Sequence, residues 1–365
     1  MSYFQETAME NKKVYGVMLV GCGHIGKQHI EDIYYRDNIR VVACVDYNID
    51  TARQFARRYG GEWDAKYGSD YREFLSLPDL DIVIIATYAE THLPIMRDCV
   101  AAGKHVLCEK PIAPTIAEAE AFCRIARASS SKVLIAHILR HNQTYAKAAE
   151  MIRAGQIGDI RLIRMVQNHH IMNKERYMRL LEDCSPIVDC GVHYVDVIRW
   201  FTGLEVVDIS GMGGIVSKVV PENTFDWGMI TMKLSNGCTA YYEAGWTDTT
   251  ASENLKEFIG TDGRIKLILA DYRTTNKEEG DLIEYYDKRT ETYTQINIKC
   301  KYKDMYGQLS ALIDMIENDS EGFPTLSDAM EAFRIVMRCD EIIRGTLNLE
   351  QKSEETALQY IGDMM

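Results

Sequence analysis

The first 135 residues alternate between short apolar runs and helix-like segments, and this alternation constrains the fold more than any other feature of the sequence. The apolar runs are typical of strands buried on both faces, and they cover Val14–Val20, Ile39–Val45, Ile82–Ala86, His105–Cys108 and Val133–Ile135. The helix-like segments cover Ile25–Tyr35, Ile49–Tyr59, Asp70–Leu75, Thr91–Ala102 and Ile116–Ala128. Because strictly alternating elements form right-handed βαβ units, we predict an α/β domain with a doubly wound parallel sheet of the Rossmann type.

Beyond residue 138 the pattern changes to longer strand-like runs with few helices between them. These runs cover Ile160–Gln167, Val206–Met212, Phe225–Leu234, Thr239–Trp246, Lys256–Thr261 and Arg264–Leu269. Two connections, Ser235–Gly237 and Thr261–Gly263, contain the Asn-Gly and Asp-Gly pairs that favour tight β-turns. Helix-like segments cover Thr144–Ala154, Cys190–Thr202, Met305–Asn318 and Ser327–Arg344. We therefore predict a second, α+β domain with a large open, mostly antiparallel sheet.

The length of the chain, 365 residues, exceeds the usual size of one hydrophobic core, so two domains are expected. We place the first at residues 13–138 and the second at 139–350, with peripheral tails at 1–12 and 351–365. The 54 acidic and 41 basic side chains give a net charge of -13. Because that charge repels a phosphate backbone and no basic cluster offsets it, we expect no nucleic-acid partner.

Membrane and metal partners are not expected either. No uncharged apolar stretch reaches the length of about 18 residues needed for a membrane span, and the N-terminus lacks the pattern of a signal peptide. We therefore expect a cytoplasmic protein. The grouping that most resembles a metal site, Cys184, Cys190 and His193, matches no common zinc spacing, so no metal is predicted.

Residues 19–26 read Leu-Val-Gly-Cys-Gly-His-Ile-Gly, a Gly-x-Gly-x-x-Gly pattern between a predicted strand and a predicted helix. In such a loop Gly21 allows the tight turn, Gly23 lets the backbone approach a pyrophosphate, and Gly26 lets the helix pack on the strand. Asp46 ends the second strand, where a carboxylate accepts hydrogen bonds from ribose hydroxyls and repels a 2′-phosphate. The pattern predicts a dinucleotide site that prefers NAD to NADP; a glycine turn with an incidental aspartate is the alternative.

Polar groups follow the later strands at the edge where such sheets bind their ligands. One stretch, Thr87 to His92, follows the third predicted strand, and Glu109-Lys110-Pro111 follows the fourth. Asp189 and His193 lie one helical turn apart if a helix begins near Asp189. Each also has a structural explanation, because a strand-end lysine is often solvated, an aspartate often caps a helix and a helical histidine often packs in the interior.

The motifs together resemble the glucose-fructose oxidoreductase, inositol dehydrogenase and MocA (Gfo/Idh/MocA) family. The resemblance covers about residues 13–345 and rests on the glycine loop with Asp46, the Thr87–His92 stretch, Glu109-Lys110-Pro111, the turn Gly155-x-Ile-Gly158 and Asp189-x-x-x-His193. It implies a catalytic set of Lys110, Asp189 and His193. It also implies a second domain whose sheet often forms oligomers, so we expect a homo-oligomer.

The resemblance further implies which residues contact the ligands. We expect the dinucleotide to contact Gly21, Gly23, His24, Ile25, Gly26, Asp46, Tyr47, Thr87, Tyr88, His92, Glu109, Lys110 and Arg140. We expect the substrate to contact Lys110, Arg140, His169, Tyr177, Asp189 and His193, with His170 and Trp246 as weaker candidates. Relatives often carry Arg-Arg-Phe or Arg-Arg-Tyr after the last Rossmann strand, where this chain has Leu139-Arg-His-Asn142.

The implied function is an NAD-dependent dehydrogenase that oxidises a secondary hydroxyl of a sugar, a glycoside or a cyclitol such as inositol. His193 would act as the base, and Lys110 would hydrogen-bond the reacting oxygen. Asp189 would orient the substrate or His193, and its charge would favour the protonated imidazole. Two alternatives stay open: a glycosidase that oxidises its sugar ring transiently with NAD, and a dinucleotide-sensing regulator without catalysis.

Overall fold

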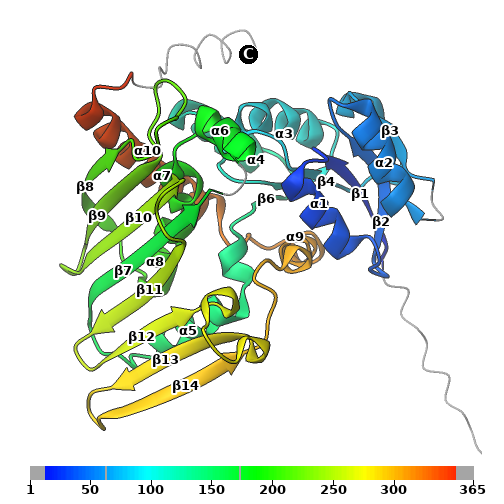
Figure 1. Cartoon of the computed structure of the whole chain (residues 1–365). Coiled ribbons are helices and arrows are strands. Elements are labelled where there is room, and N and C mark those ends of the chain that lie inside the picture. Colours follow the sequence, from blue (N-terminus) through cyan, green and yellow to red (C-terminus); the bar gives the residue numbers. More distant parts are fainter. Residues whose placement is uncertain (1–12, 62–63, 172–173, 351–365) are drawn as a thin grey trace, which may run out of the picture.

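The structure is a computed structural model that describes residues 13–61, 64–171 and 174–350 (Figure 1). The predicted tails, residues 1–12 and 351–365, lie outside these ranges. Two sheets form the framework, with the elements of the first gathered on one side of the molecule and those of the second on the other (Figure 1). None of the helices within the described ranges is both long and apolar enough to cross a membrane.

The first sheet has six parallel strands in the order β3-β2-β1-β4-β5-β6. The strands are β1 (Tyr15–Val20), β2 (Ile39–Val45), β3 (Lys66–Gly68), β4 (Ile82–Ile85), β5 (His105–Cys108) and β6 (Val133–Ile135). Its helices are α1 (His24–Ile33), α2 (Ile49–Tyr59), α3 (His92–Ala101) and α4 (Ile116–Ala128). The strand order reverses between β1 and β4, which is where a doubly wound sheet binds its ligand.

This sheet confirms the predicted Rossmann fold, with two local differences. The segment expected to form a helix at Asp70–Leu75 is a single 3₁₀ turn, η2 (Tyr71–Phe74), capped by the Asp70 side chain. The short edge strand β3 before it was not predicted, because two of its three residues are exposed and leave no apolar pattern.

The second sheet has eight strands in the order β14-β13-β12-β11-β7-β10-β9-β8, and every pair is antiparallel except β7 with β10. The strands are β7 (Ile160–His170), β8 (Val206–Gly214), β9 (Trp227–Leu234), β10 (Thr239–Thr247), β11 (Glu253–Gly260), β12 (Gly263–Ile268), β13 (Asp281–Asp287) and β14 (Thr292–Ile298). The predicted mostly antiparallel open sheet is therefore confirmed. Strands β13 and β14 extend it beyond the runs recognised in the sequence.

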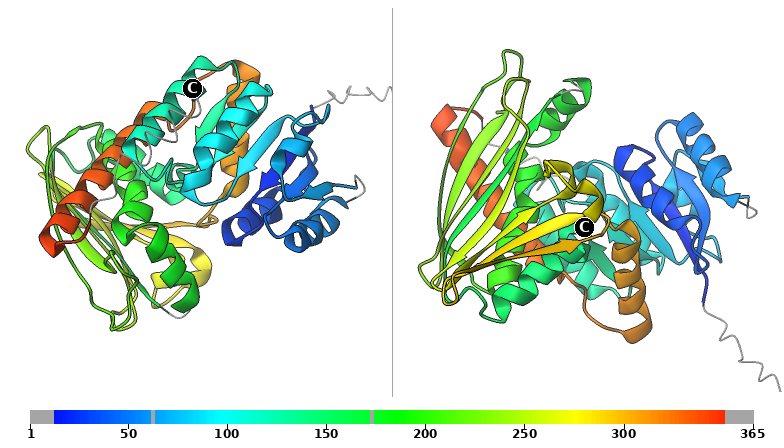
Figure 2. Two further views of the ribbon diagram at one scale, coloured as in Figure 1. Left: turned by 90° about the horizontal axis from the view of Figure 1, so that it is seen from above. Right: turned by 60° about the horizontal axis from the view of Figure 1, so that its bottom comes forward.

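Helices pack on one face of the second sheet, and no helix of residues 13–61, 64–171 and 174–350 covers the other face (Figure 2). The covering helices are α5 (Gln143–Arg153), α7 (Pro186–Asp189), α8 (Gly191–Thr202) and α10 (Leu326–Leu347), while α6 (Lys174–Asp183) follows the end of β7. Helix α9 (Met305–Asn318) does not join them. Its residues Leu309, Leu312 and Ile313 pack into the apolar core beneath β1 and α1, so the chain returns to the first sheet near its end.

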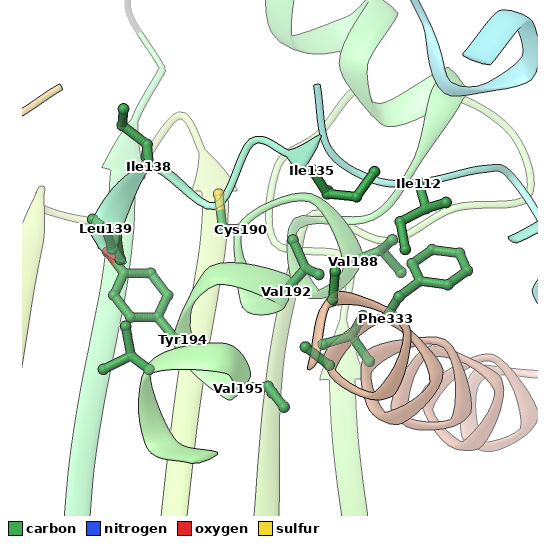
Figure 3. Close-up of a cluster of buried hydrophobic side chains, with 14 of the residues drawn as sticks. Ile112, Ile135, Ile138, Leu139, Val188, Cys190, Val192, Tyr194, Val195 and Phe333 are labelled. Atoms are coloured by element: carbon green, nitrogen blue, oxygen red, sulfur yellow. The ribbon is translucent and has the colours of Figure 1, made fainter. Parts of the chain in front are cut away.

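One apolar cluster runs from the first sheet into the helices of the second domain (Figure 3). Ile135, at the end of β6, lies near Val188 and Val192 on α7 and α8, with Phe333 of α10 beside them. All four side chains are almost fully buried. Because protein interiors are close-packed, this cluster fixes the α7–α8 turn relative to the first sheet. That turn carries Asp189 and His193.

Candidate active site

The glycine loop has three distinct local environments that match the roles expected of its glycines. Gly21 has a φ of +95°, and a Cβ there would lie 2.4 Å from the Ala86 carbonyl oxygen. A Cβ on Gly26 would lie 1.9 Å from the Gly21 carbonyl oxygen, so only glycine allows α1 to pack this closely. A Cβ on Gly23 would meet no atom within 4 Å. The loop is therefore tight on its protein side and open at Gly23, as a pyrophosphate site requires.

The N-terminus of α1 is left without side-chain caps. Gly23 is its N-cap residue, and no acidic side chain lies in the first turn, which begins with His24 and Ile25. The free N–H groups and the positive end of the helix dipole thus face the open side of the loop and would favour a bound anion. The exposed His24 ring lies with its Nε2 2.9 Å from Gln28 Nε2, one turn further along the helix.

Asp46 holds the glycine loop from the neighbouring strand. Its carboxylate accepts hydrogen bonds from the backbone N–H of Cys22 at 2.8 Å and from that of Asn48 at 2.9 Å. The Tyr47 side chain beside it is 89% exposed. Arg53, the nearby cation that could have attracted a 2′-phosphate, pairs with Asp50 at 2.9 Å. The geometry therefore suits a carboxylate that meets ribose hydroxyls at the open edge of the sheet.

The residues after β4 divide into exposed and internal groups. Tyr88 is half-exposed, and Thr87 accepts a hydrogen bond from the Thr91 hydroxyl at 2.6 Å. His92, expected to contact the cofactor, is fully buried, with Nδ1 3.0 Å from the Pro111 carbonyl oxygen and Nε2 3.2 Å from that of Thr87. The ring thus joins two loops of the site, and its cofactor contact stays a prediction that this geometry does not favour.

Glu109, also expected to contact the cofactor, has an internal partner. Its Oε1 lies 2.7 Å from Nε2 of the fully buried His29 on α1. Burial by itself raises the pKa of Glu109, but the hydrogen bond and charge of His29, together with the charge of Lys110, bring it below its ordinary value. The Glu109–His29 pair joins the end of β5 to α1, the helix of the glycine loop, and so fixes the strand end that carries Lys110.

Lys110 and Asp189 meet although 79 residues separate them in the sequence. Lys110 Nζ lies 2.5 Å from Asp189 Oδ1 and 3.0 Å from the Asp189 carbonyl oxygen. Burial lowers the pKa of Lys110, but Asp189 outweighs this effect and the pKa lies above its ordinary value. The lysine is therefore held as an ammonium ion, and two of its three N–H groups are used.

His193 lies on α8 in the turn that follows Asp189, since α7 ends at Asp189 and α8 begins at Gly191. Burial, Lys110 and His137 lower its pKa well below the ordinary value, so the ring is neutral near pH 7. The His137 ring is nearly perpendicular to it, at 5.8 Å between centroids. The expectation that Asp189 favours a protonated imidazole is wrong, because the Asp189 carboxylate is directed to Lys110 instead.

Arg140 was expected to contact the ligands, and the structure surrounds it with protein groups instead. Its guanidinium forms two hydrogen bonds of 2.8 Å with the buried carboxylate of Asp196 and lies 4.6 Å from the Phe323 ring centroid. Only 6% of the residue is exposed. A ligand contact would require breaking this buried ion pair, so the expected contacts of Arg140 with the ligands stay a prediction that this geometry does not favour.

The charge of Asp189 acts on two further residues that were expected to contact the substrate, His169 and Tyr177. His169, near the end of β7, is half-buried, and burial and Lys256 lower its pKa while Asp189 raises it. Tyr177 on α6 is half-buried with its ring 5.7 Å from that of the buried Trp246. His170 is turned towards Thr250, with Nδ1 3.1 Å from the carbonyl oxygen.

Sequence reasoning missed two lysines near the site. Lys256 on β11 is fully buried, donates a hydrogen bond to the Asn254 side chain and lies over the Tyr194 ring. Lys303, in the segment before α9, lowers the pKa of His193 and of His24. Neither belongs to a recognised motif; the one available signal was a lysine at an inward position of an apolar strand. Among the described residues, no cluster of three or more His, Cys, Asp or Glu side chains could hold a metal ion.

Comparisons with known proteins match both halves of the chain to one family. Residues 15–137 match an oxidoreductase family with an NAD-binding Rossmann fold, and residues 145–266 match the GFO/IDH/MocA C-terminal domain. A scyllo-inositol 2-dehydrogenase (NAD(+)) from Bacillus subtilis is 26% identical over 250 residues, which cover 68% of this chain and 72% of that protein.

Solved structures share the fold over nearly the whole chain. An aldose-aldose oxidoreductase from Caulobacter crescentus, solved with glycerol, has a TM-score of 0.80 at 19% identity, over 92% of this chain and 98% of that one. A putative NADPH-dependent oxidoreductase from Desulfitobacterium hafniense has a TM-score of 0.78 at 18% identity, over 91% and 95% of the two chains. With both domains matched by family, this chain belongs to the Gfo/Idh/MocA family of nicotinamide-dinucleotide oxidoreductases that act on CH–OH groups.

Proposed function

We propose that the protein is an NAD-dependent dehydrogenase that oxidises a secondary hydroxyl of a cyclitol, a sugar or a sugar glycoside to the ketone. The observation that carries the proposal is the Lys110–Asp189 ion pair of 2.5 Å beside the neutral imidazole of His193. These groups supply a cationic hydrogen-bond donor and a proton acceptor, which alcohol oxidation needs together. The relatives named as inositol and aldose oxidoreductases support a polyol as the substrate class.

The dinucleotide, when bound, supplies the hydride acceptor. The open loop at Gly23 and the uncapped N-terminus of α1 would hold its pyrophosphate, and Asp46 would accept hydrogen bonds from its adenosine ribose. Because the Asp46 carboxylate would repel a 2′-phosphate and Arg53 is paired with Asp50, we infer a preference for NAD over NADP.

Three side chains of the protein have separate roles in the proposed reaction. His193, neutral near pH 7, accepts the proton of the substrate hydroxyl. The third N–H of the Lys110 ammonium donates a hydrogen bond to the same oxygen and stabilises its developing negative charge. Asp189 keeps that ammonium charged and in place. We expect His169 and Tyr177, on which the charge of Asp189 acts, to bind other hydroxyls of the substrate.

The test is a screen for NADH formation with inositols, free sugars and glycosides, run with NAD and NADP in parallel. We expect turnover with at least one polyol and faster turnover with NAD. Lys110→Ala and His193→Ala should each lower kcat about a hundredfold or more while NAD affinity stays within about twofold. His170→Ala, a histidine turned towards Thr250, is the matched control. Unchanged kcat in both site variants would refute the assignment.

The pH profile gives an independent check on His193. A base must be deprotonated to act, and the pKa of His193 lies well below the ordinary histidine value. The kcat/KM for oxidation should therefore stay constant as the pH falls through about 6.5, the ordinary histidine pKa. It should decline only at lower pH, where His193 becomes protonated. A decline centred above that value would contradict the role of His193.

We also propose a homo-oligomer, because none of the helices in the described part of the chain covers the second face of the larger sheet (Figure 2). Light scattering of the purified protein would measure the molar mass. A mass equal to that of a single chain, 41.6 kDa, would contradict this proposal.

A further inference from the structure

The segment between β14 and α9, residues 299–304, carries a lysine from the second domain to the glycine-loop helix of the first. Lys303 Nζ donates a hydrogen bond of 3.2 Å to Gln28 Oε1 on α1. The Gln28 amide nitrogen in turn lies 2.9 Å from Nε2 of His24, the first residue of that helix. Lys303 thus lies two contacts away from the helix terminus where a pyrophosphate would bind.

Neighbouring contacts fix this segment in place. Lys301 pairs with Asp32 on α1, and the Tyr306 backbone N–H donates a hydrogen bond of 3.1 Å to the same carboxylate. From the other side, Asn142 donates hydrogen bonds to the carbonyl oxygens of Lys301 and Tyr302, at 3.4 and 3.2 Å. Lys303 is therefore presented to the site by a segment anchored at both domains.

The charge of Lys303 has no local counter-ion. Within residues 13–61, 64–171 and 174–350, no carboxylate lies within ion-pair distance of its ammonium group, although the residue is half-buried. The two carboxylates whose charges act on Lys303 already have partners, since Asp189 pairs with Lys110 and Glu109 with His29. Withdrawing a charge from water without pairing it is unfavourable, so this position favours an anionic ligand oxygen.

Two anionic oxygens could reach this position: the pyrophosphate of the dinucleotide and a carboxylate on the substrate. The Gln28–His24 contacts direct Lys303 towards the N-terminus of α1, and that helix end has no protein anion of its own. We propose that Lys303 binds the pyrophosphate from the side opposite the glycine loop, so that the second domain completes the cofactor site. This inference needs only dinucleotide binding, a property of the family, and does not depend on the proposed substrate.

The experiment measures binding to the full-length protein without substrate, by calorimetry, with NAD and with adenosine as probes. Lys303→Met should weaken NAD binding about tenfold to a hundredfold, the effect of losing one charge-assisted hydrogen bond to phosphate, and leave adenosine binding unchanged. Lys303→Arg should restore NAD affinity to within about threefold, because it keeps the charge and the donors. Lys299→Met removes the same charge from an exposed position of the same segment and should bind NAD like the wild type.

Further readouts separate a direct contact from a structural effect. The NAD affinity of Lys303→Met should depend less on salt concentration than that of the wild type, since one ion pair with phosphate is gone. Unchanged NAD affinity in Lys303→Met would overturn the proposal, as would equal weakening of adenosine. Normal NAD binding with a raised KM only for carboxylate-bearing sugars would place Lys303 in the substrate site, and this result would also refute the proposal. Because no turnover is measured with NAD or adenosine alone, a missing dehydrogenase activity would leave these binding results interpretable.

Discussion

Two alanine substitutions in the glycine loop should affect different properties of the protein. Gly26→Ala should lower its stability, and Gly23→Ala should lower its affinity for NAD. In Gly26→Ala the new methyl group would lie 1.9 Å from the Gly21 carbonyl oxygen and 3.5 Å from Leu19 Cδ1. The obstacle is backbone, which cannot rotate away as a side chain can, so we expect the upper end of the usual overpacking cost, about 3 kcal/mol. With 365 residues and an unfolding entropy of about 2.1 cal/mol/K per residue, that loss corresponds to a fall in Tm of about 4 °C.

Gly23→Ala meets no such obstacle, because nothing lies within 4 Å of its Cβ and its φ of -79° is allowed for alanine. The weaker helix cap that alanine provides and the reduced entropy of the unfolded chain roughly cancel, each about 0.5–1 kcal/mol. We therefore expect the Tm to stay within about 1 °C of the wild type. The methyl group would occupy the open side of the loop, and NAD affinity should fall at least about tenfold, or about 1.4 kcal/mol.

Thermal unfolding and calorimetric titration with NAD, applied to both variants, separate the two effects. The expected pattern is a stable Gly23→Ala protein that binds NAD poorly and a destabilised Gly26→Ala protein. Wild-type NAD affinity in Gly23→Ala would show that the pyrophosphate does not approach this residue. A wild-type Tm in Gly26→Ala would refute the steric reasoning.

Three further substitutions test other parts of the structure. Asp46→Ala removes the charge that would repel a 2′-phosphate, so the ratio of kcat/KM with NADP to that with NAD should rise at least about tenfold in parallel rate assays. Arg140→Met leaves the buried Asp196 carboxylate without its counter-ion, and chemical denaturation should show a loss of about 3–5 kcal/mol, with the KM for substrate changed less than about twofold. Lys256→Met replaces a fully buried amine that forms no ion pair among the described residues, and should raise the free energy of unfolding by about 1–3 kcal/mol at pH 7.

The stabilising effect of Lys256→Met should depend on pH in a predictable direction. Burial lowers the pKa of Lys256 in the folded protein well below that of the unfolded chain, so between the two values the unfolded state binds more protons. Wild-type stability from this group therefore rises with pH through that window, and the advantage of the methionine variant should shrink as the pH approaches about 10. A constant advantage across this range would show that the benefit comes from packing alone.

The predictions for Asp46→Ala and Arg140→Met can each be contradicted by one result. If Asp46→Ala keeps the cofactor ratio of the wild type, another group sets the preference between NAD and NADP. For Arg140→Met, a large increase in KM with little loss of stability would return that residue to the ligand site.

The sequence was most informative where strands are buried on both faces. The predicted bounds of β2, β5 and β6 agree with the structure, because parallel strands covered by helices appear as continuous apolar runs. Strand β14 gave no such signal, since most of its residues are exposed at the edge of the second sheet. The return of α9 to the first sheet could not be predicted, because its apolar face fits either core.

For the site, local motifs indicated the residue types but not their partners. The glycine loop and Asp46 could be read from spacing, because their contacts lie within one βαβ unit. The pairing of Asp189 with Lys110 rather than with His193 depends on how the α7–α8 turn meets the end of β5, across 79 residues of sequence. The Glu109–His29 and Arg140–Asp196 pairs are likewise long-range contacts of buried charges, which no spacing rule reveals.

The path of α9 also limits how the molecule could be divided. Because Leu309 and Leu312 fill the core beneath β1 and α1, a fragment that ends near residue 138 would expose the apolar surface that they cover. Any chimaera that transfers the cofactor domain to another protein would therefore have to carry residues 305–318 with it. The nucleotide-binding unit is contiguous in space but not along the chain, and its boundaries follow the core rather than the order of the sequence.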